Sequence, residues 1–145
     1  MWEVNSLRES TAADGFNTQG VMGKGLALQF KKAFPDVFIA YERACKAGDV
    51  VPGRMHVVTR PSSPRYVINF PTKTQWRLPS TLPYIRDGLR DLVARVRELG
   101  IASLAIPALG CGNGGLEWTA VKPLIVEAFA LMPEVRVVLF EPAGT

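Results

Sequence analysis

Two glycine-rich stretches decide the fold of this chain: residues 17–25, NTQGVMGKG, and residues 107–115, PALGCGNGG. Each stands where a helix is expected to begin, and the second directly follows a short apolar run. Glycine at such a junction lets the backbone approach a ligand closely, and the N-terminus of a helix favours an anionic group. Two such loops in one small domain indicate a ligand held from both sides. A nucleotide diphosphate is the expected ligand.

The segments around these loops alternate between helix and strand patterns. Apolar residues three or four apart predict an amphipathic helix from Ser80 to Gly100. Further helices are expected over residues 26–34, from Asp36 as N-cap to Ala47, and over 118–131 with Pro123 near the first turn. Strands are expected over 53–60, 66–70 (ended by Pro71), 102–106 and 134–140. This order predicts one domain over residues 1–145, a three-layer α/β/α fold with a mixed, mostly parallel sheet.

Composition is that of an ordinary globular protein, with 48% hydrophobic and 21% charged residues. We expect no membrane contact, because no apolar run approaches the roughly 18 residues of a membrane span and no signal-peptide pattern opens the chain. Two cysteines, Cys45 and Cys111, are too few for a disulfide framework, so we expect a cytoplasmic protein. With His56 as the single histidine, neither a metal nor a cofactor is expected. The net charge of +4 suits an anionic partner.

Four separate stretches resemble motifs of one family. Residues 17–27, 69–73, 106–112 and 114–118 resemble macrodomains. More narrowly, they resemble the DarG type, the DNA ADP-ribosyl glycohydrolase antitoxin that is paired with the DarT toxin. The motifs recur in the family's order, and the resemblance covers residue 17 to the end. It implies the macrodomain fold, with an ADP-ribose cleft at the carboxyl ends of the parallel strands.

The same resemblance implies a set of ADP-ribose contacts. Asn17 would contact the distal ribose, although a lone Asn here could equally be a turn residue bonded to its own backbone. The backbone of both loops would embrace the diphosphate, and Asn5 would read the adenine. The implied contacts are Asn5, Asn17, Gln19, Gly20, Val21, Met22, Gly23, Gly25, Gly110, Cys111, Gly112, Asn113, Gly114, Gly115 and Leu116. Residues 1–16 are atypical for the family, because residues 11–16 are too polar and too few for its apolar strand. Either a lost or shortened strand or a different packing of this end is expected there, with Trp2 to Leu7 as a possible short strand before it.

Lys73 is the implied catalytic residue, since it matches the family lysine that follows the strand ending in Phe-Pro-Thr. Two roles are open. A neutral Lys73, with a lowered pKa, could attack the anomeric carbon, where a charged ammonium would oppose the positive charge that builds on the sugar. A charged Lys73 could instead stabilise or protonate the leaving base. The sequence leaves both roles open.

The implied reaction removes ADP-ribose from thymidine in single-stranded DNA, a form of DNA repair that reverses the modification made by a DarT-like toxin. Related hydrolases of the terminal-ADP-ribose type pair the lysine with an Asp in the second loop. This chain has Asn113 there, which agrees with the DNA-directed branch. Two other functions remain open: an ADP-ribose reader without turnover, and a hydrolase of O-acetyl-ADP-ribose or protein-linked ADP-ribose.

Three further residues were weighed against ordinary structural roles. Trp76 and Arg77 could stack on and pair with single-stranded nucleic acid, or could be a partly buried tryptophan beside a solvated arginine. Cys111 is a poor candidate for a nucleophile, because no histidine is near it in sequence.

Overall fold

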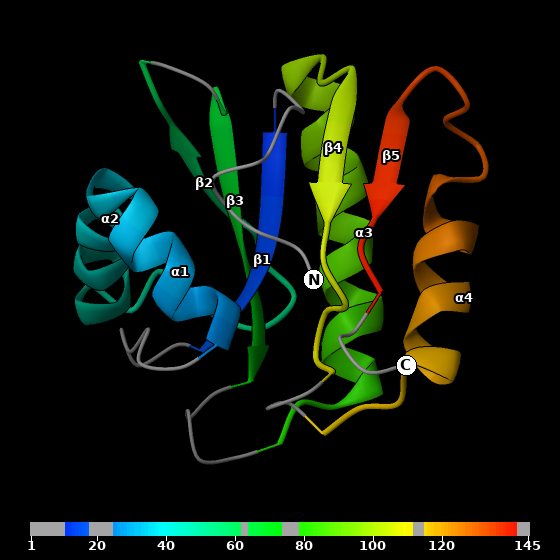
Figure 1. Cartoon of the computed structure of the whole chain (residues 1–145), viewed down its shortest axis with the longest axis horizontal. Helices are drawn as coiled ribbons and strands as arrows, with labels where there is room; N and C mark the ends of the chain where they lie inside the picture. The colour runs from blue at the N-terminus through cyan, green and yellow to red at the C-terminus, as the bar shows by residue number, and fades with distance from the viewer. Residues whose placement is uncertain (1–10, 18–24, 62–63, 74–78, 112–114, 142–145) are drawn as a thin grey trace.

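The computed structural model describes residues 11–17, 25–61, 64–73, 79–111 and 115–141. Within these residues a five-stranded sheet lies between two layers of helices (Figure 1). Helices α1 (Gly25–Ala33) and α2 (Pro35–Lys46) cover one face of the sheet. Helices α3 (Leu82–Leu99) and α4 (Trp118–Phe129) cover the other. The predicted three-layer α/β/α arrangement is therefore confirmed.

The sheet runs in the order β2-β3-β1-β4-β5. Its strands are β1 (Thr11–Asn17), β2 (His56–Thr59), β3 (Tyr66–Lys73), β4 (Ser103–Ile106) and β5 (Arg136–Leu139). Four of them run parallel, and β2 pairs antiparallel with β3 in a hairpin. The carboxyl ends of the parallel strands and the first turns of α1, α3 and α4 therefore share one edge of the sheet, the lower edge in Figure 1.

Two apolar cores hold the helices on the sheet. Successive residues of β3 divide between them, because side chains along a strand point alternately to its two faces. Val67 joins Phe30 and Tyr41 beneath α1 and α2. Ile68 and Phe70 join the larger core beneath α3 and α4. The backbone of α3 lies directly against the ring of Phe70, since a Cβ atom on Gly88 would overlap that ring.

The expectation of a lost strand over residues 11–16 is wrong, because this polar stretch forms β1 at the centre of the sheet. It pairs in parallel with β3 along its whole length, and Ala12 pairs with Ala105 of β4. Backbone pairing on both sides thus holds a segment whose own side chains give no strand pattern, as tertiary context often overrides propensity. The short strand expected between Trp2 and Leu7 lies outside the described residues.

The strand predicted to end at Pro71 continues to Lys73. Strand β2 pairs with β3 only as far as Asn69, so beyond that residue β3 has a neighbour on one side alone. A proline, which lacks the N–H donor, is tolerated in a strand at such a place. Thr72 and Lys73 therefore lie in β3 and not beyond its end.

Two helix boundaries also differ from the prediction. Helix α2 begins at Pro35 with Phe34 as N-cap, so Asp36 lies in the first turn instead of capping it. Proline suits the first helical position because the N–H it lacks would have no partner there. Pro123 lies in the second turn of α4, not near its first.

Helix α3 is the longest helix of the described chain. It begins at Leu82, two residues later than predicted, and its predicted end at Gly100 is confirmed. The Thr81 hydroxyl caps it by accepting a hydrogen bond from the Tyr84 amide at 3.4 Å, and Gly100 ends it. None of the described helices is long and apolar enough to cross a membrane.

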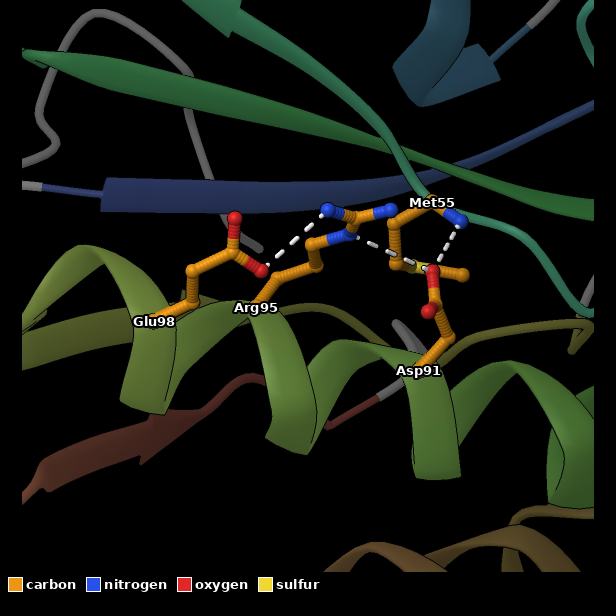
Figure 2. A network of polar contacts seen from close by, with 4 residues as sticks. All are labelled: Met55, Asp91, Arg95 and Glu98. Carbon is orange, nitrogen blue, oxygen red and sulfur yellow. Dashed lines mark hydrogen bonds and ion pairs between the residues drawn. The ribbon is translucent and has the colours of Figure 1, made fainter.

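A polar network on the outer turns of α3 ties this helix to the segment before β2 (Figure 2). Oδ2 of Asp91 accepts a hydrogen bond from the Met55 amide at 2.6 Å. The same oxygen lies 3.7 Å from Nε of Arg95, and that guanidinium also lies 3.3 Å from Glu98. The network fixes α3 relative to the β2–β3 hairpin and so contributes to fixing β3.

Candidate functional site

The last residues of β1 and β3 meet at the carboxyl edge of the sheet. Asn17 is the register partner of Lys73, so two residues predicted from the sequence as ligand contact and catalyst lie on adjacent strands. The register slips just before this pair: Phe16 stands opposite Pro71, and Thr72 is passed over. Such irregularities re-aim the residues beyond them and are frequent next to active sites.

The chain leaves the neighbouring strands β1 and β4 toward opposite faces of the sheet. After β1 the chain enters α1, whereas after β4 it enters α4 on the other side. Loops that leave adjacent parallel strands toward opposite faces diverge, and open α/β sheets bind ligands in the resulting crevice. The two glycine-rich stretches are the loops that leave β1 and β4. The topology therefore places both at one switch point, with Lys73 one strand further along.

The second glycine-rich stretch folds into a tight turn around Gly110. Its carbonyl accepts a hydrogen bond from the Leu116 amide at 2.9 Å, and Cys111 and Leu116 form an isolated parallel bridge. Gly110 has a φ of 74°, a conformation that residues with a side chain rarely adopt. A Cβ atom there would also lie 2.7 Å from Cδ1 of Leu116, 3.2 Å from Cδ1 of Ile85 and 3.3 Å from Cβ of Ser80. Both the backbone and the packing require glycine at this position.

The helices that begin at this edge of the sheet make it a favourable place for an anion to bind. The first turns of α1, α3 and α4 carry no acidic residue. The partial positive charge at each N-terminus is thus not offset by a carboxylate inside the helix, and phosphate groups bind readily at such ends. Glu117, the N-cap residue of α4, stands just before that helix, and its side chain makes no capping hydrogen bond.

The thiol of Cys111 is poorly suited to attack a substrate. Burial raises its pKa, and the nearby carboxylate of Glu117 raises it further. Its Sγ lies 3.8 Å from the carbonyl oxygen of Leu109. Because the thiolate is the reactive form, a raised pKa agrees with the weak case for a cysteine nucleophile in the sequence.

His56 is a satisfied residue of β2. Burial lowers its pKa, against an opposing effect of the Asp49 carboxylate. Its Nδ1 accepts a hydrogen bond from the side-chain amide of Asn69 at 2.8 Å, across the β2–β3 hairpin. A hydrogen bond across the hairpin thus holds the imidazole of His56.

Several predicted site residues lie outside the described part of the chain, and their contacts remain predictions. They are Asn5, Gln19, Gly20, Val21, Met22, Gly23, Trp76, Arg77, Gly112, Asn113 and Gly114. Of the others, Gly25 is the first residue of α1, and Leu116 packs against the larger core. Gly115 resumes the described chain just before Leu116.

Two residues beside the second glycine-rich stretch were missed by the sequence analysis. Ser80 is only 4% exposed, and within the described chain neither its Oγ nor the buried Nε1 of Trp118 has a hydrogen-bond partner. Trp118 ends one of the family motifs and Ser80 lies in none, but the missing partner of each side chain is a property that only coordinates reveal. In the described ranges, no cluster of three or more His, Cys, Asp or Glu side chains could hold a metal ion.

Comparison with known proteins gives a consistent result. The Macro domain family model matches residues 13–125. The DNA ADP-ribosyl glycohydrolase of Mycobacterium tuberculosis is 51% identical over 142 residues, which cover 95% of this chain and 40% of that protein. The chain thus spans less than half the length of this relative.

Solved structures agree. The macrodomain of Mycobacterium tuberculosis DarG superposes with a TM-score of 0.95 at 46% identity, covering 99% of this chain and 95% of the other. Thermosipho africanus DarTG in complex with ADP-ribose gives a TM-score of 0.88 at 37% identity, covering 94% of this chain and 39% of that one. The sheet order, the opposite directions in which the chain leaves β1 and β4, and these similarities lead to one conclusion: the chain belongs to the Macro domain family, among macrodomains of the DarG type.

Proposed function

We propose that this macrodomain is a glycosidase-type hydrolase that removes ADP-ribose from thymidine in single-stranded DNA. The observation that carries the proposal is the pairing of Asn17 with Lys73 at the carboxyl edge, one strand away from the crevice. Similarity to a protein named DNA ADP-ribosyl glycohydrolase supports the choice of reaction, and the ADP-ribose in the DarTG complex supports the choice of ligand.

The arrangement of strand ends suggests how the ligand lies. The diphosphate would bind between the loops that leave β1 and β4, against the first turns of α1 and α4. Adjacent strands are about 4.8 Å apart, so a ribose beside Asn17 is within reach of a lysine at the end of β3. Lys73 would then stand near the anomeric carbon of the distal ribose, where the bond to the base is broken.

Hydrolysis transfers this ribose from the base to water. The bond between the anomeric carbon and the base breaks, the base leaves with the electron pair, and water supplies the new oxygen and a proton. Lys73 has two candidate roles in this step. A charged ammonium would stabilise or protonate the departing base, whereas a neutral amine would attack the sugar and be released later by water.

Three lysine variants test the proposal on a single-stranded oligonucleotide that carries one ADP-ribosylated thymidine. Lys73→Ala is expected to slow ADP-ribose release by about 100-fold or more, the range for loss of an acid–base group. Lys73→Arg keeps the charge but cannot act as a neutral nucleophile. It should therefore retain part of the activity only if the ammonium serves the leaving base. Lys46→Ala, an exposed lysine of α2, is the matched control and should behave as wild type.

A pure reader would bind ADP-ribose and release none from any substrate, so Lys73→Ala would have no turnover to lose. A hydrolase of other linkages would act on O-acetyl-ADP-ribose or ADP-ribosylated protein and leave the oligonucleotide intact. Either result would refute the DNA-directed function while preserving the ligand site.

The proposed substrate also indicates a setting. DNA that carries ADP-ribose must be produced by a transferase, and a DarT-like toxin is the partner that we propose. The reaction requires access to DNA, which in a bacterium means the cytoplasm. Co-expression with such a toxin is expected to restore growth only when Lys73 is intact, and rescue by Lys73→Ala would show that protection does not depend on hydrolysis.

A further inference from the structure

Ser80 joins two elements of the proposed site. It stands immediately before Thr81, the N-cap of α3, at the end of the segment that follows β3 and Lys73. Its Cβ lies 3.3 Å from the point that a Cβ atom on Gly110 would occupy. The side chain of Ser80 therefore packs directly beneath the turn that opens the second glycine-rich stretch.

The hydroxyl of Ser80 is buried without a hydrogen-bond partner. The residue is 4% exposed, and no atom of the described chain pairs with its Oγ. Burying a hydroxyl without a partner lowers stability, whereas alanine would fill the same space without that cost. A serine at this position is therefore unfavourable in the free protein.

A second unpaired donor lies at the other end of the same stretch. Nε1 of Trp118, the first residue of α4, is also buried without a partner. Two of the four unpaired buried side-chain atoms among the described residues thus flank the chain between β4 and α4. Of the other two, Arg95 Nε lies within ion-pair distance of Asp91, and Asn69 lies further back in β3.

We propose that Ser80 is a positioning residue for the second glycine-rich stretch, and that its hydroxyl gains a hydrogen-bond partner only when a diphosphate is bound there. The inference rests on the proposed ADP-ribose site and goes beyond it by assigning a residue that supports the turn at Gly110 when ligand is bound. A group that is unpaired in the free protein and hydrogen-bonded in the complex strengthens binding by the difference in its interaction free energy between the two states. Ser80 should therefore lower the thermal stability of the free protein and raise its affinity for the ligand.

The variant Ser80→Ala separates this role from a structural one, because the two readouts should move in opposite directions. Without ligand, its Tm should rise by about 2–5 °C, as expected when one unfavourable polar burial is removed from a domain of this size. Its Kd for ADP-ribose and for ADP should rise by about 3- to 10-fold, the loss of one hydrogen bond. Its Kd for adenosine, which has no diphosphate, should stay as in wild type.

Ser103→Ala is the matched control. Ser103 is the first residue of β4, at the edge opposite the proposed site, and it has an interaction within the described chain. This variant should leave the Kd for all three ligands unchanged. Calorimetry on the whole chain supplies both Tm and Kd for each variant.

Specific results would overturn the inference. A lower Tm of Ser80→Ala with unchanged affinity would show that the hydroxyl is already satisfied in the free protein, for example by a buried water. An equal loss of adenosine affinity would show that the effect does not act through the diphosphate loop. Failure of the wild type to bind ADP-ribose would overturn the inference and the proposed function together. Binding without turnover would sink the proposed function alone, and the affinities would still decide the role of Ser80.

Discussion

Among the described glycines with a positive φ, Gly110 is the one whose replacement by alanine should destabilise the protein most, because the added methyl group meets two obstacles at once. Its φ of 74° strains a residue with a side chain by about 1–2 kcal/mol. The new Cβ would also crowd Leu116, Ile85 and Ser80 at 2.7, 3.2 and 3.3 Å. The Leu116 methyl can rotate away, but the Cβ of Ser80 is fixed to its backbone. Overpacking of this kind costs about 1–3 kcal/mol.

The two terms add to an expected loss of about 2–5 kcal/mol in the free energy of unfolding, a large part of the roughly 5–15 kcal/mol typical of a domain. Gly48→Ala is the matched control. Its φ is 77°, but nothing lies within 4 Å of its added methyl group, so it should lose only the strain term. Urea denaturation of both variants measures the difference. Equal losses would refute the packing of α3 against the second glycine-rich stretch.

Three more changes have defined outcomes. Gly88→Ala should lower the free energy of unfolding by about 1–2 kcal/mol, because its methyl group overlaps the buried ring of Phe70. This loss is expected despite the better helix propensity of alanine. A stabilised variant would show that the ring can move. Burial lowers the pKa of His56 below its usual 6.5, so folding favours the neutral imidazole. The contribution of His56 to stability is therefore complete above pH 6.5 and is lost as the pH falls below that value. Wild type should then lose more stability than His56→Gln between about pH 7.5 and 5.5, and parallel losses would contradict the shift. The raised pKa of Cys111 predicts that iodoacetamide alkylates this thiol more slowly at neutral pH than it alkylates free cysteine. Mass spectrometry measures the rate, and a rate equal to that of free cysteine would contradict the raised pKa.

The sequence predicted those parts of the fold that depend on local patterns. The period of apolar residues in α3 and its end at Gly100 are local properties, and the structure confirms them. The same holds for the alternation of strands and helices, which implies the mostly parallel sheet. The resemblance of the two glycine-rich stretches to macrodomains led to the right family.

Features that depend on the pairing of several strands could not be predicted from the sequence. Strand β1 was missed because partners on both sides, rather than its own residues, hold it in place. The continuation of β3 past Pro71 depends on where β2 stops, which is a property of the hairpin and not of the proline. For the same reason the pairing of Asn17 with Lys73 was not predicted, since it depends on a register slip between the two strands.

The most direct test of the central claim is the mass of a single-stranded oligonucleotide carrying one ADP-ribosylated thymidine, followed over time with wild-type protein in excess. The proposed reaction predicts that the mass falls to that of the unmodified DNA while free ADP-ribose accumulates in equal amount, and that Lys73→Ala leaves the modified mass unchanged over the same period. An oligonucleotide that keeps its modification, together with normal binding of ADP-ribose by the wild type, would contradict DNA-directed hydrolysis.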